Sequence, residues 1–288
     1  MKCIVLGTGS IGKRHLRNLH SLGIKELAAF DPSQEGLNII AKELNLSETY
    51  TDFNKIPFAP GNVVYICSPN HLHAEQALTA ANSGCDLFIE KPIAITLDKR
   101  DELCSVIEKK KLISLTGCNM RFYPAIQKIK AMLEAGTIGK VLSYRLEVAI
   151  YLPNWRPHLD YRKNYGAHKA QGGGAILDMI HEIDYARWLF GDPLQVSAFY
   201  DKVSDLEIDT EDLAEINLRH EGSIGNIHLD YLSHKYTRKV HVIGSKGNLF
   251  WDWHLGGVQH YDGDSKAENF YANPKDYQLN QMYLDETN

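Results

Sequence analysis

The sequence predicts an α/β fold with two domains: a doubly wound parallel sheet, then an α+β domain with an open, largely antiparallel sheet. Over residues 1–120, short apolar runs alternate with longer amphipathic runs, whereas later runs alternate polar and apolar residues between glycine-containing turns. Strands that alternate with helices form βαβ units around a parallel sheet. Strict alternation indicates an antiparallel or mixed sheet with one solvated face.

Each predicted element follows from the period of its apolar residues, and its ends are indicated by Gly, Pro, Asn and Asp. In the first domain we expect strands at 2–7, 26–31, 49–53, 62–69, 86–93 and 112–118, and helices at 11–23, 36–45, 71–84 and 96–111. In the second we expect helices at 124–136 and 172–190, and strands at 140–152, 194–203, 212–222, 223–233, 238–247 and 248–254. The tail, 262–288, is polar and loop-like.

Length and composition limit the classes of protein to consider. A chain of 288 residues has room for about two domains, and we place them at 1–122 and 123–288. The net charge of −5 and pI near 6.2 provide no basic surface for nucleic acid or an anionic membrane. The five cysteines have neither CxxC nor zinc spacing, and no apolar run suits a signal peptide or a membrane span. We therefore expect a cytoplasmic protein that has no disulfide framework. We also expect that it binds neither a membrane nor nucleic acid.

A glycine-rich turn follows the first predicted strand. Residues 7–12, GTGSIG, match G-x-G-x-x-G between a strand and a helix, and Asp31 ends the second strand. Such glycines let the backbone approach a pyrophosphate at a helix N-terminus, while the acidic residue accepts hydrogen bonds from the ribose. No arginine follows Asp31, which favours NAD over NADP. The residues assigned to the cofactor here are Gly7, Gly9, Ser10, Ile11, Gly12 and Asp31.

The helix predicted at 172–190 opens with three glycines and carries a polar stripe. Asp178, His181 and Asp184 recur every third residue, so they stay on one side of a helix. Taken alone, the stripe also fits a partly exposed face with a core histidine. We interpret Asp184 as structural.

Four further motifs, taken in order, resemble the Gfo/Idh/MocA oxidoreductase family over nearly the whole chain. They are Ser68-Pro69-Asn70, Glu90-Lys91-Pro92, GCNMRFYP at 117–124 and GGGAILDMIHEID at 172–184. The resemblance implies a Rossmann domain that binds NAD(P), and a second domain that supplies the substrate site and the oligomer interface of a homodimer or homotetramer. It implies catalytic roles for Lys91, Asp178 and His181. For the cofactor it implies Ser68, Pro69, Asn70, His73, Glu90, Lys91 and Asn119, although a structural role suits His73 equally.

The chain departs from the family pattern in two places. The commoner spacing is D-x-x-x-H, whereas Asp178 and His181 are three residues apart. Positions three apart still share a helix face. Family members usually continue in a helix that returns to the first domain, and we expect this C-terminal helix to be missing.

The chemistry expected of these residues follows from their side chains. Histidine suits proton transfer because its reference pKa, about 6.5, lies near working pH. Lys91 can polarise a substrate oxygen as a cationic donor, and Asp178 can orient His181 or bind a sugar hydroxyl. No short ligand spacing indicates a metal site.

The segment 151–171 joins a strand to the glycine-led helix and is rich in aromatic and basic residues. Aromatic faces stack on sugar rings and arginine binds phosphate or carboxylate. Similar loops occur in family members of bacterial surface-sugar pathways. An alternative is a loop whose aromatics anchor it to the fold or to another subunit. The residues assigned to substrate are Lys91, Arg121, Trp155, Arg156, Arg162, Tyr165, Asp178 and His181.

We therefore expect an NAD-dependent dehydrogenase that transfers a hydride between nicotinamide and a hydroxyl or keto carbon of a sugar, polyol or sugar nucleotide. Two alternatives remain open at this point: an NAD-assisted glycoside hydrolase and a non-catalytic, NAD-sensing binding protein.

Overall fold

The computed structural model describes residues 1–46 and 48–288, and it divides into two compact units. Unit 1 comprises Met1–Cys118 together with Tyr283–Asn288, and unit 2 comprises Asn119–Met282. The boundary predicted from the sequence, after residue 122, lies four residues beyond the observed division.

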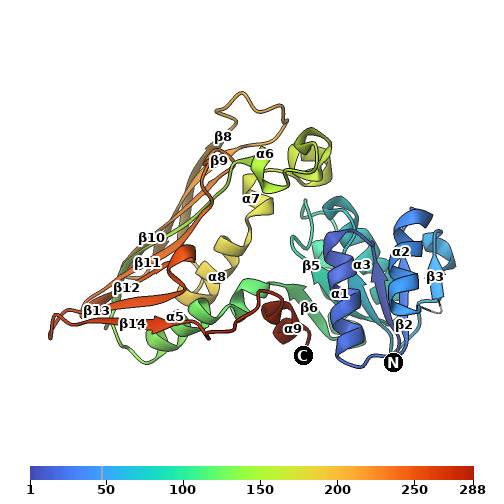
Figure 1. Ribbon diagram of the computed structural model, residues 1–288, viewed down its shortest axis with the longest axis horizontal. Coiled ribbons are helices and arrows are strands. Elements are labelled where there is room, and N and C mark those ends of the chain that lie inside the picture. The colour runs from blue at the N-terminus through green and yellow to red at the C-terminus, as the bar shows by residue number, and fades with distance from the viewer. Residues whose placement is uncertain (47) are drawn as a thin grey trace. The chain divides into compact units, whose positions relative to one another are not determined.

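Unit 1 contains a six-stranded, all-parallel sheet in the order β3-β2-β1-β4-β5-β6 (Figure 1). The strands are β1 (Cys3–Leu6), β2 (Leu27–Phe30), β3 (Glu48–Tyr50), β4 (Val63–Ile66), β5 (Asp86–Glu90) and β6 (Ser114–Gly117). The strand order reverses between β1 and β4. In open parallel sheets a ligand crevice forms beyond the carboxyl ends of the strands at such a point.

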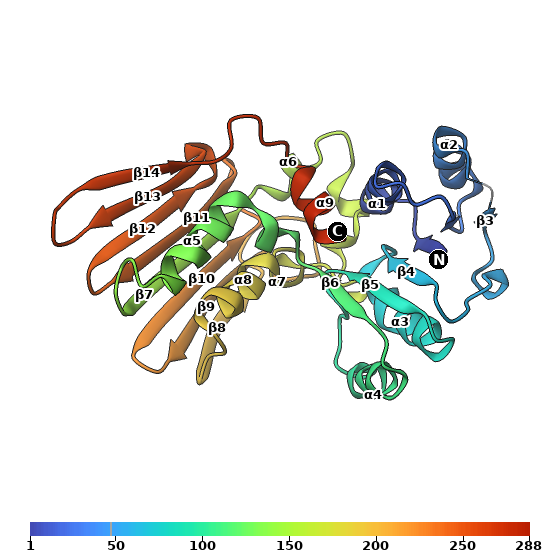
Figure 2. The same ribbon diagram turned by 90° about the horizontal axis from the view of Figure 1, so that it is seen from below.

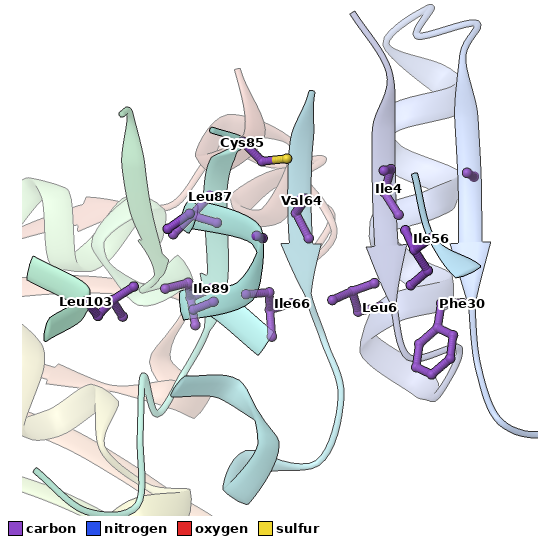
Figure 3. Close-up of a cluster of buried hydrophobic side chains, with 14 residues drawn as sticks. Ile4, Leu6, Phe30, Ile56, Val64, Ile66, Cys85, Leu87, Ile89 and Leu103 are labelled. Atoms are coloured by element: carbon purple, nitrogen blue, oxygen red, sulfur yellow. The ribbon is translucent and has the colours of Figure 1, made fainter. Parts of the chain in front are cut away.

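Helices cover both faces of this sheet. They are α1 (Ser10–Ser21), α2 (Gln34–Leu44), α3 (His73–Asn82) and α4 (Arg100–Lys110). Successive strand residues point to opposite faces, so Ile4 and Leu6 pack with α3 and α4, while Cys3 and Val5 pack with α1 and α2. Figure 3 shows the first of these clusters, in which Ile66 and Ile89 lie between Leu6 and Leu103.

Unit 2 contains an eight-stranded sheet in the order β14-β13-β12-β11-β7-β10-β9-β8. Only the β7–β10 pair is parallel. The strands are β7 (Val141–Ala149), β8 (Gln195–Asp201), β9 (Leu213–His220), β10 (Ser223–Asp230), β11 (Thr237–Gly244), β12 (Gly247–Asp252), β13 (Gly257–Asp262) and β14 (Glu268–Ala272). The predicted fold class, a Rossmann sheet followed by an open and mostly antiparallel sheet, is confirmed.

One face of the second sheet is covered by helices (Figure 2). These are α5 (Pro124–Glu134), α7 (Ala175–Asp178) and α8 (His181–Phe190). Side chains on this face are buried in strict alternation, as in β9, and the Tyr144 ring of β7 stacks on Phe190 at the end of α8 at 3.8 Å. The short helix α6 (Leu152–Trp155) and three 3₁₀ turns lie between β7 and α7.

One prediction about the C-terminal part of the chain is wrong. The segment 262–288 contains β14 and the helix α9 (Gln281–Thr287) rather than loop alone. Residues from Tyr283 onwards belong to unit 1, where the Tyr283 ring lies edge-on to His15 and the Arg14 guanidinium lies 4.4 Å above it.

Across residues 1–46 and 48–288, no helix is both long and apolar enough to cross a membrane.

Candidate active site

The turn that follows β1 has the geometry of a phosphate cradle. Gly7 has φ of +91°, and a Cβ there would lie 2.7 Å from the Cys67 carbonyl oxygen. A Cβ on Gly12 would overlap the Gly7 carbonyl, whereas one on Gly9 would meet nothing within 4 Å. The outer glycines therefore make the turn possible, and Gly9 leaves open space in front of the first turn of α1, which contains Ser10 and Ile11. Helix N-termini bind anions through their free N–H groups, so these residues fit a dinucleotide pyrophosphate.

Asp31 lies beside this turn and is held in place by it. Its Oδ2 accepts hydrogen bonds from the Thr8 backbone N–H at 2.7 Å and from the Thr8 hydroxyl at 2.9 Å, and Oδ1 accepts from the Ser33 N–H. Thr8 is buried and was not among the residues predicted from the sequence. A carboxylate held in this way is a preorganised acceptor for a ribose hydroxyl, with lone pairs left over.

His73 connects the chain beyond β4 with the chain beyond β5. Its ring nitrogens lie 2.7 Å from the Pro92 carbonyl oxygen and 2.8 Å from that of Ser68, and its side chain is buried. The pKa of His73 is lowered, because the effect of burial outweighs the two carbonyl contacts, which act in the opposite direction. The Ser68 hydroxyl donates to Gln76 at 2.6 Å. These contacts fit the structural role, and a contact between His73 and the cofactor stays a prediction.

Glu90, at the end of β5, forms a buried pair with a histidine of α1. Its Oε1 lies 2.7 Å from His15 Nε2, and its Oε2 accepts from the Lys91 backbone N–H at 3.2 Å. A Cβ on Gly117 would lie 3.1 Å from the Glu90 carboxyl group. Glu90 is thus enclosed by protein, and it fixes the backbone of Lys91 from inside unit 1. Asn70 is buried in a 3₁₀ turn after Pro69, whereas Asn119 belongs to unit 2.

In unit 2, the predicted glycine-led helix is two helices. The chain leaves α-helical geometry at Met179, which follows α7, and Ile180 then precedes α8. Asp178 therefore ends one helix and the half-buried His181 begins the next. The glycines serve packing within unit 2: a Cβ on Gly173 would overlap the Tyr165 carbonyl, and Gly174 adopts φ of +109° against the Glu211 carboxylate.

Asp178 is buried between two tyrosines. The Tyr165 hydroxyl donates to Oδ1 at 2.6 Å and the Tyr231 hydroxyl donates to Oδ2 at 2.9 Å. Burial, followed by the Asp178 charge, raises the pKa of both tyrosines well above the ordinary value, so both stay protonated donors. The sequence predicted Tyr165 as a substrate contact and missed Tyr231, which is fully buried at the end of β10.

A pocket opens onto Asp178 within unit 2. It is lined by Leu152, Trp155, Arg156, Leu159, Tyr161, Asn164, Gly166 and Asp178. The Arg156 guanidinium lies 5.7 Å from the centre of the Tyr165 ring. The pocket combines apolar and aromatic walls with a cation, an amide and a carboxylate, which is the composition expected of a site for a small polar ligand.

Two arginines predicted to contact substrate are engaged by carboxylates. The Arg162 Nε donates to Asp160 at 2.8 Å and its Nη1 donates to Glu207 at 3.1 Å. Arg121 donates through Nε to Asp184 at 2.8 Å, which gives Asp184 the structural role expected of it. Within the described residues, no group of three or more His, Cys, Asp or Glu side chains is arranged to hold a metal ion.

Comparison with known proteins identifies both units. Residues 1–117 match the model of an oxidoreductase family with an NAD-binding Rossmann fold, and residues 126–250 match the GFO/IDH/MocA C-terminal domain. The chain is 31% identical to myo-inositol 2-dehydrogenase of Thermotoga maritima over 261 residues, which cover 88% of this chain and 75% of that protein. The chain belongs to the Gfo/Idh/MocA family.

Further similarities agree with this family. The chain is 26% identical over 278 residues to scyllo-inositol 2-dehydrogenase (NAD(+)) of Bacillus subtilis, which cover 90% of this chain and 75% of that protein. A solved structure of levoglucosan dehydrogenase with NADH and levoglucosan shares the fold, with a TM-score of 0.86 at 21% identity over 99% of this chain and 87% of that one. This Gfo/Idh/MocA protein is therefore an NAD-dependent oxidoreductase with an NAD(P)-binding Rossmann domain.

Proposed function

We propose that this Gfo/Idh/MocA protein is a dehydrogenase that acts on a CH–OH group of a sugar, polyol or sugar nucleotide. The observation that carries the proposal is the buried Asp178 carboxylate, which borders a pocket and lies three residues before His181. Relatives named as inositol dehydrogenases add support for polyhydroxylated substrates.

Each catalytic side chain has a distinct role in this proposal. When bound, NAD supplies the acceptor for the hydride that leaves the alcohol carbon. The Lys91 ammonium donates a hydrogen bond to the reacting oxygen and stabilises the charge that develops on it. His181 takes the hydroxyl proton, because imidazole is the side chain that most often acts as a general base. Asp178 accepts a hydrogen bond from a hydroxyl of the substrate and orients it.

We also propose that the cofactor is NAD rather than NADP. Asp31 is an acidic residue fixed by Thr8, and the residues that follow it, Pro32, Ser33 and Gln34, have no ionisable side chains. A 2′-phosphate near this carboxylate would meet like-charge repulsion that no neighbouring residue in the sequence offsets.

Recognition of an anionic substrate group would rest on Arg156 rather than on Arg162. Arg156 lines the pocket, whereas Arg162 is exposed and lies between two carboxylates. Arg156→Ala should therefore lower kcat/KM by about 10- to 100-fold for a phosphorylated or carboxylated sugar, and less for a neutral one. Arg162→Ala is the matched control and should change it little. Equal losses in both variants for all substrates would contradict anion recognition by Arg156.

We further propose that the protein forms a homodimer or homotetramer through the second sheet. Phe199, Ile224 and Phe270 are exposed on the sheet face opposite the helices. Light scattering of the wild type and of Phe199→Glu would test this, since a monomeric wild type is incompatible with it.

The function itself is tested by a thermal-shift screen of sugars, polyols and sugar nucleotides with NAD, followed by absorbance at the NADH band for each hit. Stoichiometric NADH formation supports a dehydrogenase. Turnover without net NADH would indicate a hydrolase, and binding without turnover would indicate a sensor.

A further inference from the structure

The Asp178 carboxylate has a hydrogen-bond donor on each oxygen, and the two donors come from distant parts of unit 2. Tyr165 lies in the 3₁₀ turn Tyr165–Ala167, and Tyr231 directly follows β10. Their hydroxyls lie 2.6 and 2.9 Å from Oδ1 and Oδ2. We call Tyr165 and Tyr231 the tyrosine pair.

We propose that the tyrosine pair positions Asp178 as a charged hydrogen-bond acceptor, so that Asp178 orients a substrate hydroxyl while His181 alone transfers the proton. This inference rests on the proposed function. An ionised carboxylate has acceptor sites only, and a hydroxyl donor on each oxygen matches that state. A protonated Asp178 would direct its own hydrogen towards one of two groups that already donate to it.

The packing around the carboxylate fixes this geometry. A Cβ on Gly166 would lie 3.2 Å from Asp178 Oδ2, and one on Gly173 would overlap the Tyr165 carbonyl. The chain that carries Tyr165 can therefore lie this close only because position 173 is glycine, and a side chain at position 166 would press on the carboxylate. Two hydrogen bonds fix the backbone of Tyr231. Its N–H donates to the Asp212 carbonyl at 2.8 Å, and its carbonyl accepts from the Leu152 N–H at 3.0 Å.

Two charged side chains, one basic and one acidic, lie near the start of α7 and the pocket that Asp178 lines. Arg156 lies near the Tyr165 ring and lines the pocket together with Asp178. Glu211 accepts a hydrogen bond from the Ile176 N–H at 3.0 Å at the start of α7. With the tyrosine pair and His181, these groups determine the pH response that the experiment below measures.

The first measurement needs neither substrate nor cofactor. In the full chain labelled with 13C at the aspartate side-chain carboxyl carbons, the Asp178 signal is assigned by Asp178→Asn and followed against pH. In Tyr165→Phe, Tyr231→Phe and the double variant, we expect the carboxyl to titrate at a higher pH, by about one pH unit in the double variant. Tyr144→Phe is the matched control, because it removes a buried tyrosine hydroxyl that lies 2.8 Å from His220 instead. Asp178 titration that is unchanged in all three variants overturns the proposal.

The second measurement uses a substrate found by the screen. Each single variant should lower kcat/KM by about 10-fold or more, mainly through KM, while the pH at which kcat falls stays where it is in the wild type. A shift of that pH in the tyrosine variants would mean that Asp178 carries the proton, which overturns the division of roles. A loss no larger than in Tyr144→Phe would mean that the pair is merely structural. If the wild type oxidises nothing, the proposed function fails, yet the titration still decides how the tyrosine pair acts on Asp178.

Discussion

Removing one partner of the buried Glu182–Arg238 ion pair should destabilise unit 2 strongly. Glu182 follows His181 in α8 and its side chain is fully buried, and Arg238 of β11 is 11% exposed. Arg238 donates through Nε to Oε1 at 2.6 Å and through Nη2 to Oε2 at 3.0 Å, and the Tyr185 hydroxyl adds a bond at 2.9 Å. The pair therefore ties the start of α8, with His181, to the sheet.

The expected loss of stability in Glu182→Gln follows from the burial of the ion pair. Desolvation lowers the pKa of Arg238, but the Glu182 charge and the other groups around it outweigh desolvation and leave the pKa raised, so the guanidinium stays charged. In Glu182→Gln that charge remains buried without a counter-charge, which costs about 3–5 kcal/mol. For a unit of this size we expect the melting temperature of its transition to fall by at least about 6 °C. Glu182→Gln combined with Arg238→Met should recover much of the loss, because neither charge is then left alone.

Urea and thermal unfolding, followed by circular dichroism, measure these differences. Asp184→Asn is the matched control on the same helix, because its partner Arg121 is 40% exposed and such a pair contributes about 1 kcal/mol or less. If Glu182→Gln costs no more than Asp184→Asn, the argument from burial is refuted.

Three further outcomes are expected. NAD should bind at least about tenfold more tightly than NADP, a difference of roughly 1.4 kcal/mol, and Asp31→Ala should reduce the ratio; calorimetric titration that finds tighter NADP binding would contradict this role of Asp31. Lys91→Ala and His181→Ala should each lower turnover about 10²-fold or more with NAD affinity nearly unchanged, and near-normal turnover in either variant would remove its assigned role. The hydrogen bond to Asp230 raises the pKa of His228 to about 9, so the stability that this pair provides is complete below about pH 6.5 and is lost as pH rises through 9. Allowing for solvent screening, urea unfolding should show a loss of about 1–2 kcal/mol that is absent in His228→Gln.

The limits of sequence-based prediction are visible at particular elements. Strand β14, at the edge of the second sheet, was missed because its side chains are mostly exposed on both faces, so the strand lacks the alternation that marks a half-buried strand. The helix predicted over 172–190 breaks at Met179 and Ile180, a break that no proline or glycine marks in the sequence.

Local patterns in the sequence by themselves determined the order of strands and helices in the first domain, the glycine turn and the place of Asp31. Each of these depends on residues close together in the chain, through hydrophobic periodicity or the conformational freedom of glycine. Only the tertiary structure decided which side chains meet: Tyr231 reaches Asp178 across 53 residues and His15 reaches Glu90 across 75. Such pairs are selected by packing, because a buried polar group must find a partner in whichever segment the fold brings beside it.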